Sequence, residues 1–134
     1  MYLKEGHIEH ALDFIKNNYS SISVADISSY LGIDRSYFAV LFKQSQGVSA
    51  REYLLYVRMR KSSHMLTGTS MSVQEIARYV GYENALTFSK TFKRFFGVSP
   101  KYYREMPVEE RPSATAILET MKNSNSGSED ETEK

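Results

Sequence analysis

The sequence contains no cysteine and no long apolar run. Without cysteine, the chain has no disulfide, no thiolate ligand for a metal and no cysteine nucleophile. No stretch approaches the roughly 20 consecutive apolar residues that a membrane-spanning helix requires, and the N-terminus lacks the basic and then apolar plan of a secretory signal. These absences predict a soluble, cytoplasmic protein that makes no contact with a membrane.

Groups that could hold a metal or carry a reaction are also scarce. The three histidines, His7, His10 and His64, stand at spacings that form no recognisable ligand set. A metal site needs three or four convergent ligands, so we interpret each histidine as a surface or packing residue. Paired carboxylates, a glycine-rich phosphate loop and a nucleophile motif are missing as well. The sequence therefore predicts no cofactor, no metal and no enzymatic activity.

The net charge of +1 hides an uneven distribution of charge along the chain. Residues 1–106 hold 14 Lys and Arg against 9 Asp and Glu, a net of +5, whereas residues 107–134 hold 3 against 7, a net of −4. The basic part is the candidate partner for a polyanion. Residues 123–134 carry no apolar side chain, so burial cannot offset the entropy of ordering them. We expect residues 107–134 to form an acidic, largely disordered tail that either solubilises the chain or competes for its basic face.

The chain repeats itself about every 50 residues. The first copy, residues 24–54, reads VADISSYLGIDRSYFAVLFKQSQGVSAREYL, and the second copy, residues 73–104, reads VQEIARYVGYENALTFSKTFKRFFGVSPKYYR. The shared positions, at an offset of 49 and then of 50, include Val24 and Val73, Ile27 and Ile76, Gly32 and Gly81, Phe38 and Phe88, Phe42 and Phe92, and Gly47 and Gly97. A long period that occurs only twice indicates two small domains of one design.

Each copy carries the start and stop signals of three helices. A serine with a carboxylate three residues later starts the first helix, a glycine ends it, and an Asp or Asn caps the second. These residues are Ser23, Asp26, Gly32 and Asp34 in one copy, and Ser72, Glu75, Gly81 and the Glu83–Asn84 pair in the other. After Gly47 and Gly97, a third helix starts at Ser49 with Glu52 and at Ser99 with Pro100.

Apolar residues follow helical spacing in the remaining segments too. Ile8, Leu12, Ile15 and Tyr19 indicate an amphipathic opening helix. A helix of about 25 Å is expected from Ala50 to Leu66, where it separates the two copies and also serves as the third core helix of the first. With no alternating β pattern, the predicted fold is all-α. It comprises two homeodomain-like, three-helix helix-turn-helix subdomains, residues 1–48 and 69–106, joined by a linker helix, residues 49–68.

A helix-turn-helix lays its second helix in the DNA major groove while the first helix braces it. We expect Phe38, Leu41 and Phe42 to face the core of one copy, and Phe88, Phe92 and Phe95 to face the core of the other. The opposite faces are then the candidate reading surfaces. They carry Arg35, Ser36, Ala39, Val40 and Lys43 in the first copy, and Asn84, Leu86, Ser89, Lys90, Lys93 and Arg94 in the second.

The two reading faces differ in chemistry. Lys90 can donate to guanine or to a phosphate, whereas Lys93 and Arg94, towards the helix end, are placed for phosphates. The side chains of Ala39 and Val40 form no hydrogen bonds. They either contact thymine methyl groups or are simply exposed on the protein surface without a role in binding. We therefore expect the second copy to supply more of the hydrogen-bonded readout.

Laid out in this way, residues 8–104 resemble the AraC/XylS family of bacterial transcription regulators, whose DNA-binding region has two helix-turn-helix units joined by a long helix. The second copy carries the motifs EIA, VGY, F-S-x-x-F-K, G-V-S-P and a closing Y-R. The resemblance implies sequence-directed binding of double-stranded promoter DNA through both units, and activation by contact with RNA polymerase. The family's reading positions fall on Ser36, Ala39, Val40, Asn84, Ala85, Leu86, Ser89 and Lys90.

Most family members also have a ligand-binding or dimerising domain, for which this chain has no room. We therefore expect it to be the DNA-binding part of a longer ligand-responsive regulator that forms a homodimer through a domain absent here; sugar metabolism is a common assignment in the family. A related DNA-repair enzyme uses a cysteine, which this chain lacks. A protein-interaction module, or an architectural or recombination module with weak DNA binding, stays open as an alternative.

Overall fold

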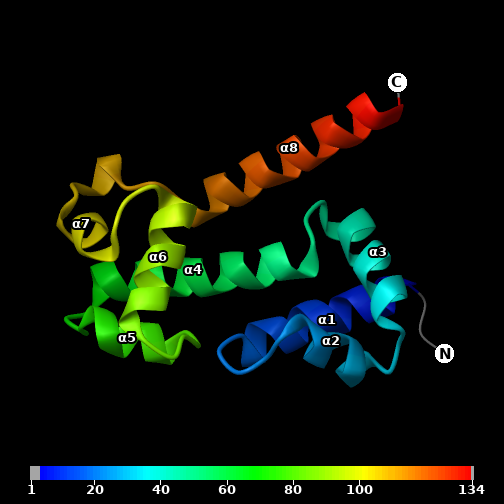
Figure 1. Cartoon of the computed structure of the whole chain (residues 1–134), viewed down its shortest axis with the longest axis horizontal. Helices are drawn as coiled ribbons and strands as arrows, with labels where there is room; N and C mark the ends of the chain where they lie inside the picture. The colour runs from blue at the N-terminus through cyan, green and yellow to red at the C-terminus, as the bar shows by residue number, and fades with distance from the viewer. Residues whose placement is uncertain (1–3, 134) are drawn as a thin grey trace. The chain divides into compact units, whose positions relative to one another are not determined.

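The computed structural model describes residues 4–133, with side chains from residue 6 to residue 125. Within that range the chain forms helices and turns and no strand, which confirms the all-α prediction. The elements are α1 (Lys4–Asn18), α2 (Val24–Leu31), α3 (Arg35–Gln46), α4 (Ala50–Gly68), α5 (Val73–Tyr79), α6 (Ala85–Phe96), α7 (Pro100–Glu105), the 3-10 turn η1 (Val108–Glu110) and α8 (Ala114–Glu133) (Figure 1). No helix in this part of the chain has the length and apolar content needed to cross a bilayer.

The helices divide into two compact units. The first unit contains the chain up to Leu55 and from Glu119 on, and the second unit contains Tyr56–Leu118. The helix that we predicted both as a linker and as the third core helix of the first copy is divided between the two units. Leu54 and Tyr56, on the two sides of the division, are both buried, and so is Met59. Because its side chains pack on both sides of the division, α4 is a core helix of each unit.

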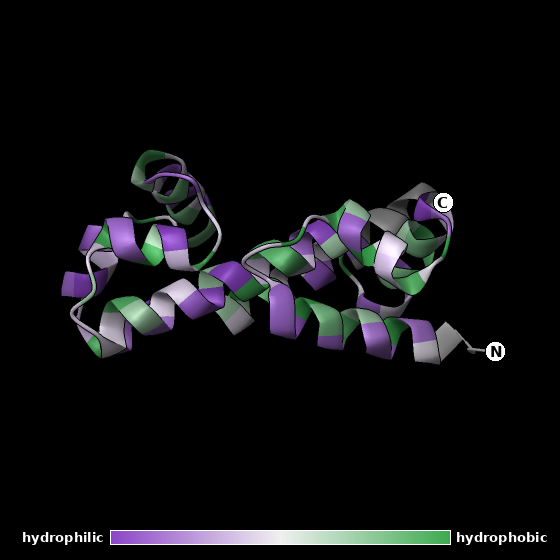
Figure 2. Cartoon of the chain, turned by 90° about the horizontal axis from the view of Figure 1, so that it is seen from below, coloured by the Kyte–Doolittle hydropathy of each residue, from purple (hydrophilic) through white to green (hydrophobic). Residues whose placement is uncertain are grey.

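The core of the first unit is built from α1, α2 and α3. Ile8 and Ile15 of α1, Ile27 of α2, and Phe38 and Phe42 of α3 are all buried. Hydrophilic and hydrophobic residues alternate along the helices, as the purple and green segments of the coloured ribbon show (Figure 2). Each helix is therefore held in place by the burial of one apolar stripe.

The core of the second unit is a row of aromatic rings on α6. The ring centroids of Phe88 and Phe92 lie 5.7 Å apart, and those of Phe92 and Phe96 lie 4.5 Å apart. The prediction that Phe95 completes this row is wrong, because Phe96 is buried while Phe95 is half-buried and meets the edge of Phe96. Both positions continue a stripe that starts at Phe92, but Phe96 is the one that packs against Phe92 and Tyr103.

The predicted caps form as hydrogen bonds. In the Ser72–Glu75 box, the Glu75 carboxylate accepts the Ser72 N–H at 2.9 Å and the Ser72 hydroxyl accepts the Glu75 N–H at 3.1 Å. The Ser23–Asp26 box is closed in the same way. The turn after α2 uses Gly32 at φ 70°, in the left-handed region that favours glycine. These local signals fix where the helix-turn-helix elements begin and end.

We expected an acidic, largely disordered tail at residues 107–134, a segment that the structure describes as far as residue 133. The chain turns through η1 and continues as α8, in which Ala114 and Leu118 are buried. Tyr103 donates its hydroxyl to the carbonyl oxygen of Pro112 at 3.0 Å, which fixes the approach to α8. The acidic composition of the whole segment concealed the short apolar stripe at the start of this helix. Residue 134 and the side chains of residues 126–133 lie outside the described part.

Candidate nucleic-acid interface

In the first unit, α2 and α3 form the helix-turn-helix. Asp34 caps α3, because its carboxylate accepts the N–H groups of Ser36 at 3.0 Å and Tyr37 at 3.1 Å. Phe38, Leu41 and Phe42 face inward, as predicted. The other face of α3 is exposed and brings together every residue that the sequence assigned to it. These exposed residues are Arg35, Ser36, Ala39, Val40 and Lys43.

The exposed face of α3 is apolar at its centre. Val40 keeps 58% of its surface accessible, and Tyr37, which our sequence reasoning did not select, keeps 46%. Tyr37 and Val40 are three residues apart and so are neighbours on the helix surface. Lys43 places a cation at the end of this face. The combination suits contact with apolar base edges, together with a phosphate partner for the lysine.

In the second unit, α5 and α6 form the equivalent pair. Asn84 caps α6 by accepting the N–H of Thr87 at 2.9 Å on its side-chain oxygen. We selected Asn84 from the sequence as a reading residue, and the structure gives that oxygen a second task. The side-chain amide N–H groups are not used by the cap, so Asn84 can still donate to DNA.

The exposed face of α6 is more strongly basic than that of α3. Leu86, with 66% of its surface accessible, Lys90 and Lys93 follow one another along this face, and Arg94 lies beside them, also exposed. Ala85 and Ser89 are half-buried at its edge. The structure therefore brings Leu86, Lys90 and Lys93 together at the centre and leaves Ala85 and Ser89 at the margin.

An aromatic brace that the sequence did not reveal supports α6 from behind. The Arg58 guanidinium of α4 lies 5.6 Å from the ring centroid of Tyr82, which packs against Phe88 at 5.6 Å. Burial raises the pKa of the Tyr82 phenol above its usual value, although the Arg58 charge opposes the shift. In the first copy the corresponding residue is Ile33, so this brace belongs to the second unit alone.

A second tie fixes the loop that leads into α5. Arg104 of α7 donates to the carbonyl oxygens of Leu66 at 2.8 Å, Met71 at 2.6 Å and Thr69 at 3.4 Å. One planar guanidinium thus holds the end of α4 and the start of the second helix-turn-helix. The closing Y-R of the second copy was the sequence signal for this residue, but it did not reveal the partners.

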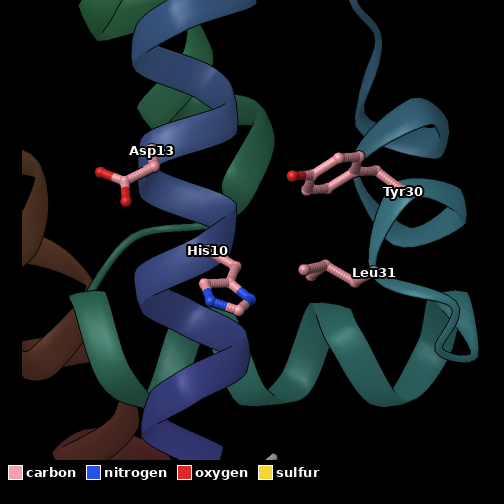
Figure 3. Close-up of a pocket in the computed structure, with 4 residues that line it drawn as sticks. All are labelled: His10, Asp13, Tyr30 and Leu31. Atoms are coloured by element: carbon pink, nitrogen blue, oxygen red, sulfur yellow. The ribbon is translucent and has the colours of Figure 1, made fainter.

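A pocket of about 330 Å³ lies on α1 and α2 of the first unit (Figure 3). Tyr30 and Leu31 point from α2 toward α1, whereas Asp13 points to the other side of α1. The ring of Tyr30 is stacked on Phe14, with centroids 4.1 Å apart. The lining side chains therefore do not converge on one point. No group of three or more His, Asp or Glu residues gathers anywhere among the described side chains.

The comparisons with known proteins agree with this geometry. The family model described as "Helix-turn-helix domain" matches residues 27–106, which is more than half of the chain. The chain is 44% identical over 98 residues to the lactose operon transcription activator of Staphylococcus xylosus, covering 72% of this chain and 35% of that protein. It is 40% identical over 96 residues to the raffinose operon transcriptional regulatory protein RafR of Pediococcus pentosaceus, covering 71% and 35%. The chain thus spans about a third of the length of these relatives.

Solved structures share the fold. The C-terminal domain of AraT, a response regulator from Geobacillus stearothermophilus, aligns with a TM-score of 0.72 at 30% identity, covering 79% of this chain and 91% of that one. The DNA-binding domain of AdpA, a global transcriptional factor solved in complex with a target DNA, aligns with a TM-score of 0.67, covering 73% and 88%; at 21% identity this likeness shows the fold alone. The chain belongs to the AraC type of helix-turn-helix DNA-binding domain, found in transcription regulators rather than enzymes.

Proposed function

We propose that this chain is the sequence-specific DNA-binding part of a longer transcription activator, and that α3 and α6 each enter the major groove of a promoter. One observation carries the proposal. In both units the second helix of the helix-turn-helix buries two phenylalanines at equivalent positions and exposes a face that ends in lysine. The buried residues are Phe38 and Phe42 in α3 and Phe88 and Phe92 in α6, and the lysines are Lys43 and Lys93. A buried bracing face and an exposed cationic face are what groove binding requires.

The two helices divide the task of recognition. On α6, Lys90 reads a guanine edge, Asn84 and Ser89 add polar contacts at the margin, and Lys93 and Arg94 bind phosphates. Leu86 and Ala85 provide apolar contact. On α3, Ala39 and Val40 meet thymine methyl groups, Ser36 and Arg35 lie near the start of the helix, and Lys43 binds a phosphate.

The lengths and names of the relatives extend the proposal beyond this chain. Since it spans 35% of the lactose operon activator and of RafR, we infer that the full protein carries a ligand-binding and dimerising domain besides. We further infer that it activates a sugar-utilisation operon by contact with RNA polymerase. It would act in the bacterial cytoplasm, where promoter DNA lies.

Selection of bound DNA from a random pool tests the proposal. We expect the chain to enrich two separate half-sites, one for each reading helix. Binding should also fall steeply with salt, with a log–log slope near −5 if about six phosphates are neutralised. A pool without enrichment and a flat salt response would instead favour a protein-interaction module. Steep salt dependence without enrichment would favour an architectural or recombination module.

A further inference from the structure

Helix α8 lies outside the segment matched by the family model, residues 27–106, and contacts residues within it. From Glu119 on, this helix belongs to the first unit. The Asn125 side-chain amide donates to the carbonyl oxygen of Gly47 at 3.1 Å and lies 3.5 Å from the Glu52 carboxylate. The contact joins residues more than 70 positions apart, so no local sequence pattern revealed it.

The two partners of Asn125 flank the turn between the reading helix α3 and α4: Gly47 ends α3, and Glu52 lies in the first turn of α4. Gly47 is the C-cap of α3, and its N–H donates to the carbonyl oxygen of Lys43 at 2.9 Å. Glu52 closes the capping box that starts α4 by accepting the N–H of Ser49 at 2.9 Å. Carbonyl groups at a helix end have no partner within the helix, and Asn125 supplies one there. The Asn125 side chain therefore contacts both sides of the turn between α3 and α4.

The second unit offers an internal comparison. A Cβ atom at Gly47 would lie 3.3 Å from Cγ of Lys122, because α8 packs directly on this turn. Among the described residues, nothing lies within 4 Å of a Cβ atom built at Gly97, the equivalent residue. The position of Glu52 is taken by Tyr102, which is 60% exposed and has no carboxylate to share. Helix α8 thus covers the end of α3, whereas the equivalent point at the end of α6 is open.

We propose that α8 holds the end of the first reading helix, α3, in place, and that Asn125 is the positioning residue of this contact. We call this contact the clasp. The inference rests on the proposed function, in which α3 reads DNA. The α3 face relies on Ala39 and Val40, whose van der Waals contacts weaken when a gap of 0.5–1 Å opens. An apolar reading face therefore needs firmer support than one with long, flexible lysines, and α8 gives that support to α3 alone.

Two substitutions and a matched control test the clasp. Asn125→Ala removes the donor, and Asn125→Asp keeps the shape but places a negative charge beside Glu52. Asn123→Ala changes an exposed asparagine on the same helix. Binding is measured on DNA that carries both selected half-sites and on two DNAs in which one half-site is scrambled. To identify the half-site that α3 reads, the selection is repeated with Val40→Ala. The half-site at which the base preference changes is the one bound by α3.

For both Asn125 variants we expect binding to the α3 half-site to weaken about threefold to tenfold, the net effect of one hydrogen bond. Binding to the α6 half-site and binding by Asn123→Ala should stay at the wild-type value. Unchanged binding of the Asn125 variants at both half-sites, or an equal loss at both, overturns the proposal.

Hydrogen exchange separates this inference from the proposed function. The amide of Gly47 should exchange faster in Asn125→Ala than in the wild type, while the amide of Gly97 should not change. This comparison needs no DNA, so it supports or overturns the clasp even if the wild-type protein selects no sequence. Failure of the wild type to select DNA counts only against the proposed function.

Discussion

The guanidinium of Arg58 lies over the ring of Tyr82, 5.6 Å from its centroid. Tyr82 in turn packs against Phe88, at the base of the second reading helix. The pair links α4 to α6, so that the long helix carries part of the support for the reading face. In the first unit α3 has no equivalent pair, because Ile33 stands where the second unit has Tyr82.

Arg58→Met should lower the free energy of unfolding by about 0.5–1 kcal/mol, because methionine keeps the apolar stem but removes the cation over the ring. Urea unfolding followed by circular dichroism measures the change. Arg60→Met, at an exposed position of the same helix, serves as the control and should change stability far less. Equal losses in the two variants would show that the ring contact adds nothing specific.

Lys90→Ala should relax discrimination at one or two base pairs by about 1–3 kcal/mol, because Lys90 lies on the central exposed face of α6. Lys93→Ala should weaken binding to all sequences alike, because a phosphate contact carries no sequence information. Titrations of target and random DNA with both variants measure the difference. If Lys90→Ala weakens binding to the two DNAs equally, its assignment to base readout is wrong.

Much of the fold follows from short-range sequence signals. Ser72 and Glu75 are three residues apart, and their capping box forms as the spacing predicts. The ends of α3 and α6 are likewise fixed by glycines visible in the sequence. Such caps depend on neighbours along the chain, and for this reason a single sequence reveals them.

Several of the missed features depend on residues far apart in the chain. Asn125 meets Gly47, and Arg58 meets Tyr82, only after the helices have packed. The periodicity of α6 could not separate Phe95 from Phe96, since both continue the same stripe. For the reading faces, the sequence predicted which side of each helix is exposed, whereas the roles of Lys90 and Val40 toward DNA stay predictions.

Alkaline pH should destabilise the second unit through its buried tyrosines. Burial raises the pKa of Tyr82 and of Tyr103 above the ordinary value of 10.0, because the charged phenolate is poorly solvated there. The folded state then holds its phenol protons more tightly than the unfolded state. The contribution of these two phenols to the free energy of unfolding is complete below about pH 10. It is lost as the pH rises through their folded-state pKa.

Urea midpoints between about pH 8 and pH 11 measure this loss. Tyr82→Phe should flatten the alkaline decline, because phenylalanine has no proton to lose. Tyr79→Phe, at a position that is 59% exposed, should leave the decline unchanged. The same decline in all three proteins would mean that buried tyrosines do not cause it.

The Arg104 tie predicts that even the conservative change Arg104→Lys costs stability. The guanidinium reaches the carbonyl oxygens of Leu66, Met71 and Thr69 from one planar fork, which a lysine ammonium cannot reproduce. Hydrogen bonds from a charged donor contribute about 1.5–3 kcal/mol each. Because the site is only half-buried and lysine retains one bond, we expect a loss of about 2–3 kcal/mol in the free energy of unfolding.

Thermal and urea unfolding measure this loss, and Arg78→Lys, an exposed position on α5, is the matched control. The loss of the Arg104 hydrogen bonds should also loosen the start of the second helix-turn-helix. If the loop into α5 loosens, hydrogen exchange should rise at the amides of Ser72 and Glu75, at the start of the second helix-turn-helix, before it rises in α3. Unchanged stability and unchanged exchange in Arg104→Lys would mean that the packing of α7, rather than its arginine, holds the loop.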